Sequence, residues 1–203
     1  DIAADATRAV EVIQNVRSLV HKGEGIRMPL NLNSVIIDSV RITKQDVISH
    51  ASILTTELDP ELPEVDGDAV QIQQVLLNLI ANALEAMGGI APSERRIVIR
   101  TRLGNEHMVE LIVRDHGSGL PKDNPGKIFD HFYSTKQRGM GMGLSIVQSI
   151  VEAHAGTIKA ENAPDHGARI VIRLPAVKAG VVEKSGQLIE DNAFHLRSPK
   201  DFP

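Results

Sequence analysis

The sequence predicts an α+β domain over residues 27–175, preceded by one helix within residues 1–24 and followed by a tail or linker over residues 176–203. Two observations carry this prediction. Apolar residues recur with the helical period of 3.6 residues in segments that begin at capping residues and end at glycines. Other segments alternate in polarity or are mostly apolar, which is typical of strands, and they cover residues 52–58, 96–103, 108–115, 157–161 and 168–174.

Composition allows a folded domain and excludes several classes of protein. Of 203 residues, 42% are hydrophobic and 24% are charged, so a sizeable core is possible. The chain has no cysteine, which excludes disulfides and cysteine-bound metals, and no apolar run approaches the ~20 residues of a membrane span. A net charge of −4 gives no reason to expect nucleic acid. Because no signal peptide is visible and the chain starts within a pattern, we expect a cytoplasmic fragment, which leaves open a membrane anchor in the full-length protein.

Residues 1–22 predict a helix with an apolar seam. Its apolar residues recur at spacings of 4, 3, 4, 3 and 4, and they are Ile2, Ala6, Ala9, Ile13, Val16 and Val20. Such heptad spacing is typical of a helix that packs along another helix. This helix either lies on its own domain or belongs to a dimeric bundle, and we favour the bundle.

The next segments predict a short strand over residues 28–32 and a helix over residues 34–49 that Asn33 caps. A longer helix follows, with Asp68 as its cap and Gly88 after its end. The apolar side of this longer helix consists of Val70, Val75, Leu76, Leu79, Ile80 and Leu84.

A polar stripe runs along the same long helix. It comprises Gln71, Gln74, Asn78, Asn82 and Glu85, whose spacings of 3, 4, 4 and 3 place them on one side. A solvated face is one interpretation, but such faces usually carry Lys and Glu, because Asn is a poor helix former. Amide oxygens are hard ligands that suit Mg²⁺, so the stripe also predicts a metal site.

The strand over residues 108–115 ends in a carboxylate that precedes a glycine turn, Asp115-His116-Gly117-Ser118-Gly119. A carboxylate in this position can accept a hydrogen bond from an exocyclic amine, while the glycines leave room for a flat ring. A plain turn is the alternative interpretation.

A glycine-rich stretch, Gly139-Met140-Gly141-Met142-Gly143-Leu144, leads directly into an amphipathic helix. Glycines let the backbone approach an anion closely, and a helix N-terminus offers unpaired N–H groups and a positive dipole end. The stretch therefore predicts a phosphate site, although a flexible loop would look similar. Just before it, the aromatic residues Phe129, Phe132 and Tyr133 cluster in a chain that has only five aromatic residues of this kind.

Taken in order, these four motifs resemble the N, G1, F and G2 boxes of sensor histidine kinases of two-component systems. The run from Phe129 to Lys136 and the glycines after it are similar to the oxygen-sensing and nitrogen-regulatory branch. The resemblance implies the ATP-binding fold of the GHKL superfamily, a two-layer α/β sandwich with three helices on one face of a mixed sheet. It further implies transfer of the ATP γ-phosphoryl to a histidine, relay to a response-regulator aspartate, and a homodimeric full-length protein.

The resemblance also implies roles for individual residues. Asn78 and Asn82 would hold Mg²⁺ and the phosphates, and Asp115 would bond the adenine amino group. The residues implied in catalysis are Asn78, Asn82, Glu85 and Lys136. The further residues implied in ATP binding are Gly117, Gly119, Leu120, Phe132, Ser134, Thr135, Lys136, Arg138, Gly139, Met140, Gly141, Met142, Gly143 and Leu144.

Three departures qualify the resemblance. The family's phosphate acceptor is a histidine followed by an acidic residue, and none of the eight histidines here has one, so the acceptor helix is expected to be missing. Ala155 stands where the family often has Gly, and Arg169 stands where a small residue often lies near adenine. A catalytically inactive nucleotide-binding or interaction module is therefore an alternative. ATPases of the same fold carry Glu at the position of Asn78 to activate water, and an amide cannot act as that base, so an ATPase with rapid hydrolysis is disfavoured. A dinucleotide-binding domain is also disfavoured, because no βαβ unit surrounds the glycines.

Overall fold

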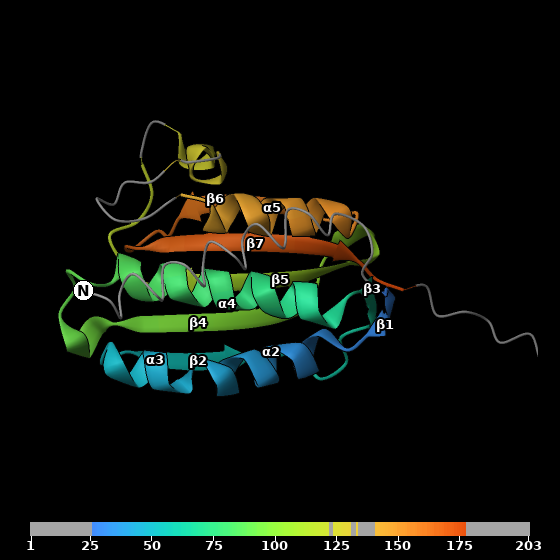
Figure 1. Ribbon diagram of the computed structural model, residues 1–203, viewed down its shortest axis with the longest axis horizontal. Helices are drawn as coiled ribbons and strands as arrows, with labels where there is room; N and C mark the ends of the chain where they lie inside the picture. Colours follow the sequence, from blue (N-terminus) through green and yellow to red (C-terminus); the bar gives the residue numbers. More distant parts are fainter. Residues whose placement is uncertain (1–25, 122–123, 131–132, 134–140, 178–203) are drawn as a thin grey trace, which may run out of the picture.

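The computed structural model describes residues 26–121, 124–130, 133 and 141–177, which form two layers, a sheet and a set of helices (Figure 1). The large sheet has the strand order β2-β4-β5-β7-β6. Its strands are β2 (Ile53–Glu57), β4 (Arg96–Leu103), β5 (Met108–Asp115), β6 (Thr157–Asn162) and β7 (Ala168–Pro175). The pair β2–β4 is parallel and the other pairs are antiparallel, so the sheet is mixed, as the resemblance implies.

The described helices lie on one face of this sheet (Figure 1). They are α2 (Leu32–Ile42), α3 (Lys44–Ser49), α4 (Ala69–Ala86) and α5 (Gly143–Ala153). A small antiparallel sheet of β1 (Met28–Leu30) and β3 (Val65–Gly67) stands at one end. Three short 3₁₀ helices complete the described elements: η1 (Pro92–Glu94), η2 (Asn105–His107) and η3 (Pro125–Phe129). None of the helices described is long and apolar enough to cross a membrane.

The hydrophobic core lies between the sheet and the helices. Each strand turns every second side chain inward, so Ile97 and Ile99 of β4 and Ile172 of β7 are almost fully buried. The helices contribute their apolar stripes, such as Leu76 and Ile80 of α4, which are completely buried. The predicted bounds of β4 and β5 are confirmed, and those of β6 and β7 are each confirmed to within one residue.

The first predicted cap is wrong by two residues. The Oδ1 atom of Asn31, not of Asn33, accepts the backbone N–H of Ser34, at 3.1 Å. Asn33 lies within α2, where its Nδ2 donates to the Asp59 carbonyl at 2.7 Å and its Oδ1 accepts the Thr101 hydroxyl at 2.9 Å. Asn33 therefore bridges three segments and does not cap the helix.

The predicted helix over residues 34–49 is in fact two helices. The chain leaves the helical path at Thr43, whose hydroxyl donates to the Ser39 carbonyl of the preceding turn at 2.9 Å. One apolar assignment on α4 is also wrong. Val70 lies in the first helical turn, beyond the edge of the core, and is 73% exposed.

His154 links the end of α5 to the start of α4. Its Nε2 accepts the backbone N–H of Asp68 at 3.1 Å, and its Nδ1 donates to the Ile150 carbonyl at 2.7 Å. A ring nitrogen that accepts carries no proton, so these two bonds select the neutral form protonated on Nδ1. The ring is 2% exposed and holds the two helices in a fixed relation.

The described chain continues for two residues past the predicted end of the domain. The N–H of Ala176 donates to the His107 carbonyl at 2.9 Å, and that of Val177 donates to the Glu64 carbonyl at 2.7 Å. The predicted helix over residues 1–22 and the remainder of the tail, residues 178–203, lie outside the described residues. The proposed domain limits therefore stay predictions.

Candidate functional site

The asparagines of α4 face the first residue of α5. The Nδ2 of Asn78 lies 3.5 Å from the Gly143 carbonyl, and the Nδ2 of Asn82 donates to the Asn78 carbonyl one turn back, at 2.8 Å. A Cβ on Gly143 would lie 3.6 Å from the Nδ2 of Asn82. Both asparagines are half-buried, and Glu85 is exposed one turn further on. Two stretches 65 residues apart in sequence therefore meet here.

The N-terminus of α5 differs from those of α2 and α4. Asn31 caps α2 and Asp68 caps α4, each with a side-chain oxygen that accepts backbone N–H groups. The residue in this position at α5 is Met142, which makes no side-chain cap. The N-cap residue of α5 therefore offers no side-chain acceptor to the first N–H groups of the helix. These N–H groups can donate to a bound anion instead. Gly141, just before the helix, has a φ of +64°, which favours glycine.

Asp115 ends β5 as a buried carboxylate that is 8% exposed. Its Oδ1 accepts the backbone N–H of Gly117 at 2.8 Å and that of Ala168, in β7, at 3.2 Å. Burial raises the pKa of the Asp115 carboxyl above its usual range, and these two N–H donors lower it only in part. Among the described residues no donor reaches Oδ2, so this oxygen can accept from a ligand.

The glycines after Asp115 are required by neighbouring protein atoms. A Cβ on Gly117 would lie 2.7 Å from the Ala86 carbonyl oxygen at the end of α4, so a side chain there would push the loop from the helix. Gly119 has a φ of +77°, and a Cβ on it would lie 2.7 Å from the Oδ1 of Asn162. The structure thus gives close backbone packing as a reason for these glycines, beside the predicted room for a flat ring.

The segment between the two glycine motifs is described only in part. Phe129 and Tyr133 pack against the edge of the core, and Leu120, Met142 and Leu144 do the same. Seven of the predicted site residues lie outside the described residues, and they are Phe132, Ser134, Thr135, Lys136, Arg138, Gly139 and Met140.

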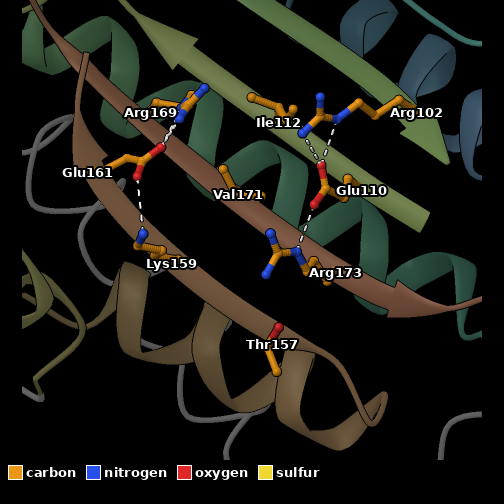
Figure 2. Close-up of a pocket in the computed structure, with 9 residues that line it drawn as sticks. All are labelled: Arg102, Glu110, Ile112, Thr157, Lys159, Glu161, Arg169, Val171 and Arg173. Atoms are coloured by element: carbon orange, nitrogen blue, oxygen red, sulfur yellow. Dashed lines mark hydrogen bonds and ion pairs between the residues drawn. The ribbon is translucent and has the colours of Figure 1, made fainter. Parts of the chain in front are cut away.

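The expectation that Arg169 lies near the candidate base site is wrong. Arg169 follows Ala168 in β7, and alternation along the strand turns its side chain to the opposite face of the sheet. Figure 2 shows it there, paired with Glu161 of β6. We call this side of the large sheet the open face, because none of the described helices covers it (Figure 1).

A buried carboxylate occupies the middle of the open face. Glu110 accepts from the Nε atoms of Arg102 and Arg173, each at 2.7 Å, and its side chain is 4% exposed (Figure 2). Burial raises the pKa of Glu110, but the hydrogen bonds from Arg173 and Arg102 outweigh it and hold the pKa below the usual range. These residues line a pocket of about 180 Å³ on the open face (Figure 2). Asp115 stands five residues after Glu110 in β5, so alternation along the strand turns its side chain to the other face of the sheet.

The comparisons with known proteins agree with this geometry. The family model described as "Histidine kinase-, DNA gyrase B-, and HSP90-like ATPase" matches residues 67–178, more than half of the chain. The chain belongs to this family of ATPases. Its matched region runs from β3 through Asp115 and α5 to the end of β7.

Curated relatives place the chain within this family. It is 39% identical over 175 residues to the sensor protein FixL of Bradyrhizobium diazoefficiens, and 37% identical over 174 residues to the sensor histidine kinase ZraS of Klebsiella oxytoca. It is 35% identical over 176 residues to the sensor histidine kinase TmoS of Ectopseudomonas mendocina. These matches cover 86% of the chain but only 34%, 37% and 18% of the respective relatives. The chain spans about a fifth to just over a third of their length.

Solved structures give the same result. The nucleotide-free catalytic domain of histidine kinase ThkA has a TM-score of 0.66 and 30% identity, covering 74% of this chain and 96% of that one. ThkA in complex with the response regulator TrrA has a TM-score of 0.68 and 25% identity, covering 85% of this chain and 49% of that one. The domain is therefore an ATP-binding histidine kinase catalytic domain, as the four motifs predict.

Sequence reasoning missed two contributions to the site. Ala168 donates its backbone N–H to Asp115, and Asn162 bonds the loop after Asp115. A backbone donor has no sequence signature, so Ala168 could not have been found. Asn162 stands at the end of a predicted strand, where an isolated asparagine is easily taken for an ordinary turn residue.

Proposed function

We propose that this chain binds Mg-ATP and transfers the γ-phosphoryl to a histidine on a dimerisation helix that the chain does not contain. The phosphoryl would then pass to an aspartate of a response regulator. The observation that carries this proposal is the meeting of the α4 asparagines with the uncapped start of α5, while Asp115 stands at the end of the neighbouring strand β5.

Asp115 would recognise the adenine base. Its Oδ1 is held by two backbone N–H groups, which leaves Oδ2 to accept a hydrogen bond from an exocyclic amine. A base with a carbonyl oxygen at that position would face the carboxylate with another acceptor, so adenine is favoured over guanine.

The start of α5 would bind the phosphates. Its first N–H groups and dipole favour an anion, and Gly141 and Gly143 let the backbone come close. Lys136 and Arg138 are proposed to neutralise the β- and γ-phosphates, and Phe129 is proposed to anchor the lid with Phe132. Ser134, Thr135 and Met140 are proposed to line the same lid.

Asn78 and Asn82 would hold Mg²⁺. The Nδ2 of Asn82 donates to the Asn78 carbonyl, which leaves the Oδ1 of Asn82 to bind the metal. Oxygen is the ligand atom that Mg²⁺ prefers. Among the described residues no group of three or more His, Cys, Asp or Glu side chains could hold a metal, which fits an ion that relies on amides, water and phosphate. When bound, Mg²⁺ neutralises phosphate charge.

Phosphoryl transfer requires positioning and charge neutralisation more than covalent help from the protein. An amide at position 78 cannot act as a base on water, so transfer to a histidine is favoured over hydrolysis. Glu85 is proposed to orient water or the metal. We propose a homodimer for the full-length protein and a response regulator as its partner. ThkA, with which the chain shares its fold, has been solved with the response regulator TrrA.

Calorimetric titration with a non-hydrolysable ATP analogue, with and without Mg²⁺, tests the binding. We expect metal-dependent binding with a Kd in the micromolar range, about −8 kcal/mol. A histidine-bearing dimerisation hairpin added in trans with labelled ATP then tests transfer. Binding without transfer would favour the alternative of an inactive nucleotide-binding module, and absence of binding would refute the proposal.

A further inference from the structure

Asn162 ties the end of β6 to the loop that follows Asp115. Its Oδ1 accepts the backbone N–H of Leu120 at 2.7 Å, and its Nδ2 donates to the carbonyl of the same residue at 3.2 Å. One amide thus satisfies both backbone groups of a residue 42 positions away. We call the segment from Asp115 to Leu120 the 115–120 loop.

The fit between this loop and Asn162 is close. Gly119 precedes Leu120, and a Cβ on Gly119 would lie 2.7 Å from the Oδ1 of Asn162, which is shorter than any ordinary contact. The φ of +77° at Gly119 turns the chain so that Leu120 presents its N–H and carbonyl to the amide.

The other end of the 115–120 loop is held by the same hairpin. The turn between β6 and β7 closes with the Ala163 N–H donating to the Gly167 carbonyl at 2.9 Å. The next residue, Ala168, donates its N–H to the Oδ1 of Asp115. The packing is tight, since a Cβ on Gly167 would lie 2.1 Å from the Asp115 carbonyl oxygen. The two ends of one turn therefore bond the two ends of one loop.

We propose that Asn162 is a positioning residue for nucleotide binding, because it fixes the Leu120 end of the 115–120 loop to the end of β6 while Ala168 of β7 holds the Asp115 end, so that the loop keeps the shape in which the free oxygen of Asp115 faces the base. The inference rests on the proposed function and adds a residue that touches no ligand. Without the amide, the Leu120 end of the loop would bond water and adopt other conformations, and binding would have to restore the ordered one.

Calorimetry of Asn162→Ala with Mg²⁺ and the non-hydrolysable ATP analogue tests this role, at a temperature where the variant is folded. Two exposed hydrogen bonds to one residue are lost, and we expect the affinity to fall roughly three- to tenfold. Because the 115–120 loop would contact the base and not the phosphates, ADP should lose affinity by the same factor.

Asn33→Ala is the matched control. Asn33 also bridges separate segments through both ends of its amide, bonding Asp59 and Thr101, but it does so at the opposite edge of the domain. We expect Asn33→Ala to lower Tm and to leave nucleotide affinity within twofold of wild type. If Asn162→Ala likewise lowered Tm and left nucleotide affinity unchanged, the role of Asn162 would be merely structural and the inference would be overturned.

Asn162→Asp provides a second variant if Asn162→Ala fails to fold. It keeps the acceptor for the Leu120 N–H and loses the donor to the Leu120 carbonyl, so we expect at least a twofold loss of affinity. Wild-type affinity in Asn162→Asp would overturn the inference while wild-type binding still supports the proposed function. Absence of binding by the wild type itself would refute both.

Discussion

The substitution Asp115→Asn should separate nucleotide recognition from folding. Asparagine keeps an Oδ1 that can accept the N–H groups of Gly117 and Ala168. It replaces Oδ2 with an amide nitrogen, which would face the adenine amine donor to donor. A hydrogen bond to a charged acceptor is worth about 1.5–3 kcal/mol, so ATP affinity should fall roughly 10- to 150-fold, as measured by calorimetry.

The same substitution should not lower the free energy of unfolding at pH 7. Burial raises the pKa of Asp115 in the folded state, so the folded protein binds a proton more tightly than the unfolded chain does. Stability from this group is present below the ordinary pKa of 3.8 and is lost as pH rises through the folded value. At pH 7 the ionised carboxylate is therefore a cost that asparagine removes.

Urea denaturation measures this second quantity, and Asp66→Asn, at an exposed position in β3, controls for a general loss of negative charge. Affinity equal to wild type in Asp115→Asn would refute the assignment of Oδ2 to the base. A decrease of more than about 1 kcal/mol in the free energy of unfolding would refute the electrostatic argument, since it would mean that the charge supports the fold.

Three further predictions follow from single residues. Asn82→Ala should weaken Mg-ATP binding by about tenfold or more and reduce the effect of Mg²⁺ in calorimetry, because it removes a metal and phosphate contact. Ala155→Gly should raise the free energy of unfolding in urea by about 0.5–1 kcal/mol, because Ala155 has a φ of +53°. Glu110→Gln should lower the free energy of unfolding by about 1–2 kcal/mol at pH 7, because a neutral amide cannot balance two guanidinium groups. The deficit should shrink as pH falls below 4.5, because stability from a carboxylate with a lowered pKa is lost on protonation.

Each of these three has a control or a contradicting result. Unchanged affinity in Asn82→Ala would exclude the metal assignment. As the control for Ala155→Gly, Ala81→Gly at an exposed position inside α4 should instead lower the free energy of unfolding by about 1 kcal/mol. Equal effects at positions 81 and 155 would contradict the strain argument. A Glu110→Gln deficit that is the same at pH 7 and pH 3 would show that packing, and not charge, holds the open face together.

Local patterns in the sequence predict much of the fold. The alternation in β4 and β5, the Asp68 cap at the start of α4 and Gly88 after its end are short-range signals, and they place these elements almost to the residue. Asn31 and Asn33 show the limit, because asparagine is a good cap at either position and the partners that Asn33 bonds from within the helix, Asp59 and Thr101, are distant in the sequence. Tertiary contacts of this kind have no local signature.

The candidate site is predicted to a similar extent. Periodicity places Asn78 and Asn82 on one stripe, and the structure brings that stripe to Gly143. The direction of Arg169 was misjudged because a motif gives the position of a residue along a strand but not the face to which the strand turns it. The carboxylate of Glu110 on that same face was missed because its two arginine partners come from different strands.

The pairing of β5 with β7 has a consequence for the order in which the domain is assembled. Asp115 and the Ala168 N–H that it accepts are 53 residues apart, and Met108 pairs with Pro175, so this ladder closes a long loop. During synthesis α4 and the β4–β5 hairpin emerge well before β7. A nascent chain of that length contains the carboxylate but not the strand that fixes it. We therefore expect pulse-labelled amide exchange to protect Ala168 late, which makes competence for the nucleotide one of the last properties that folding confers.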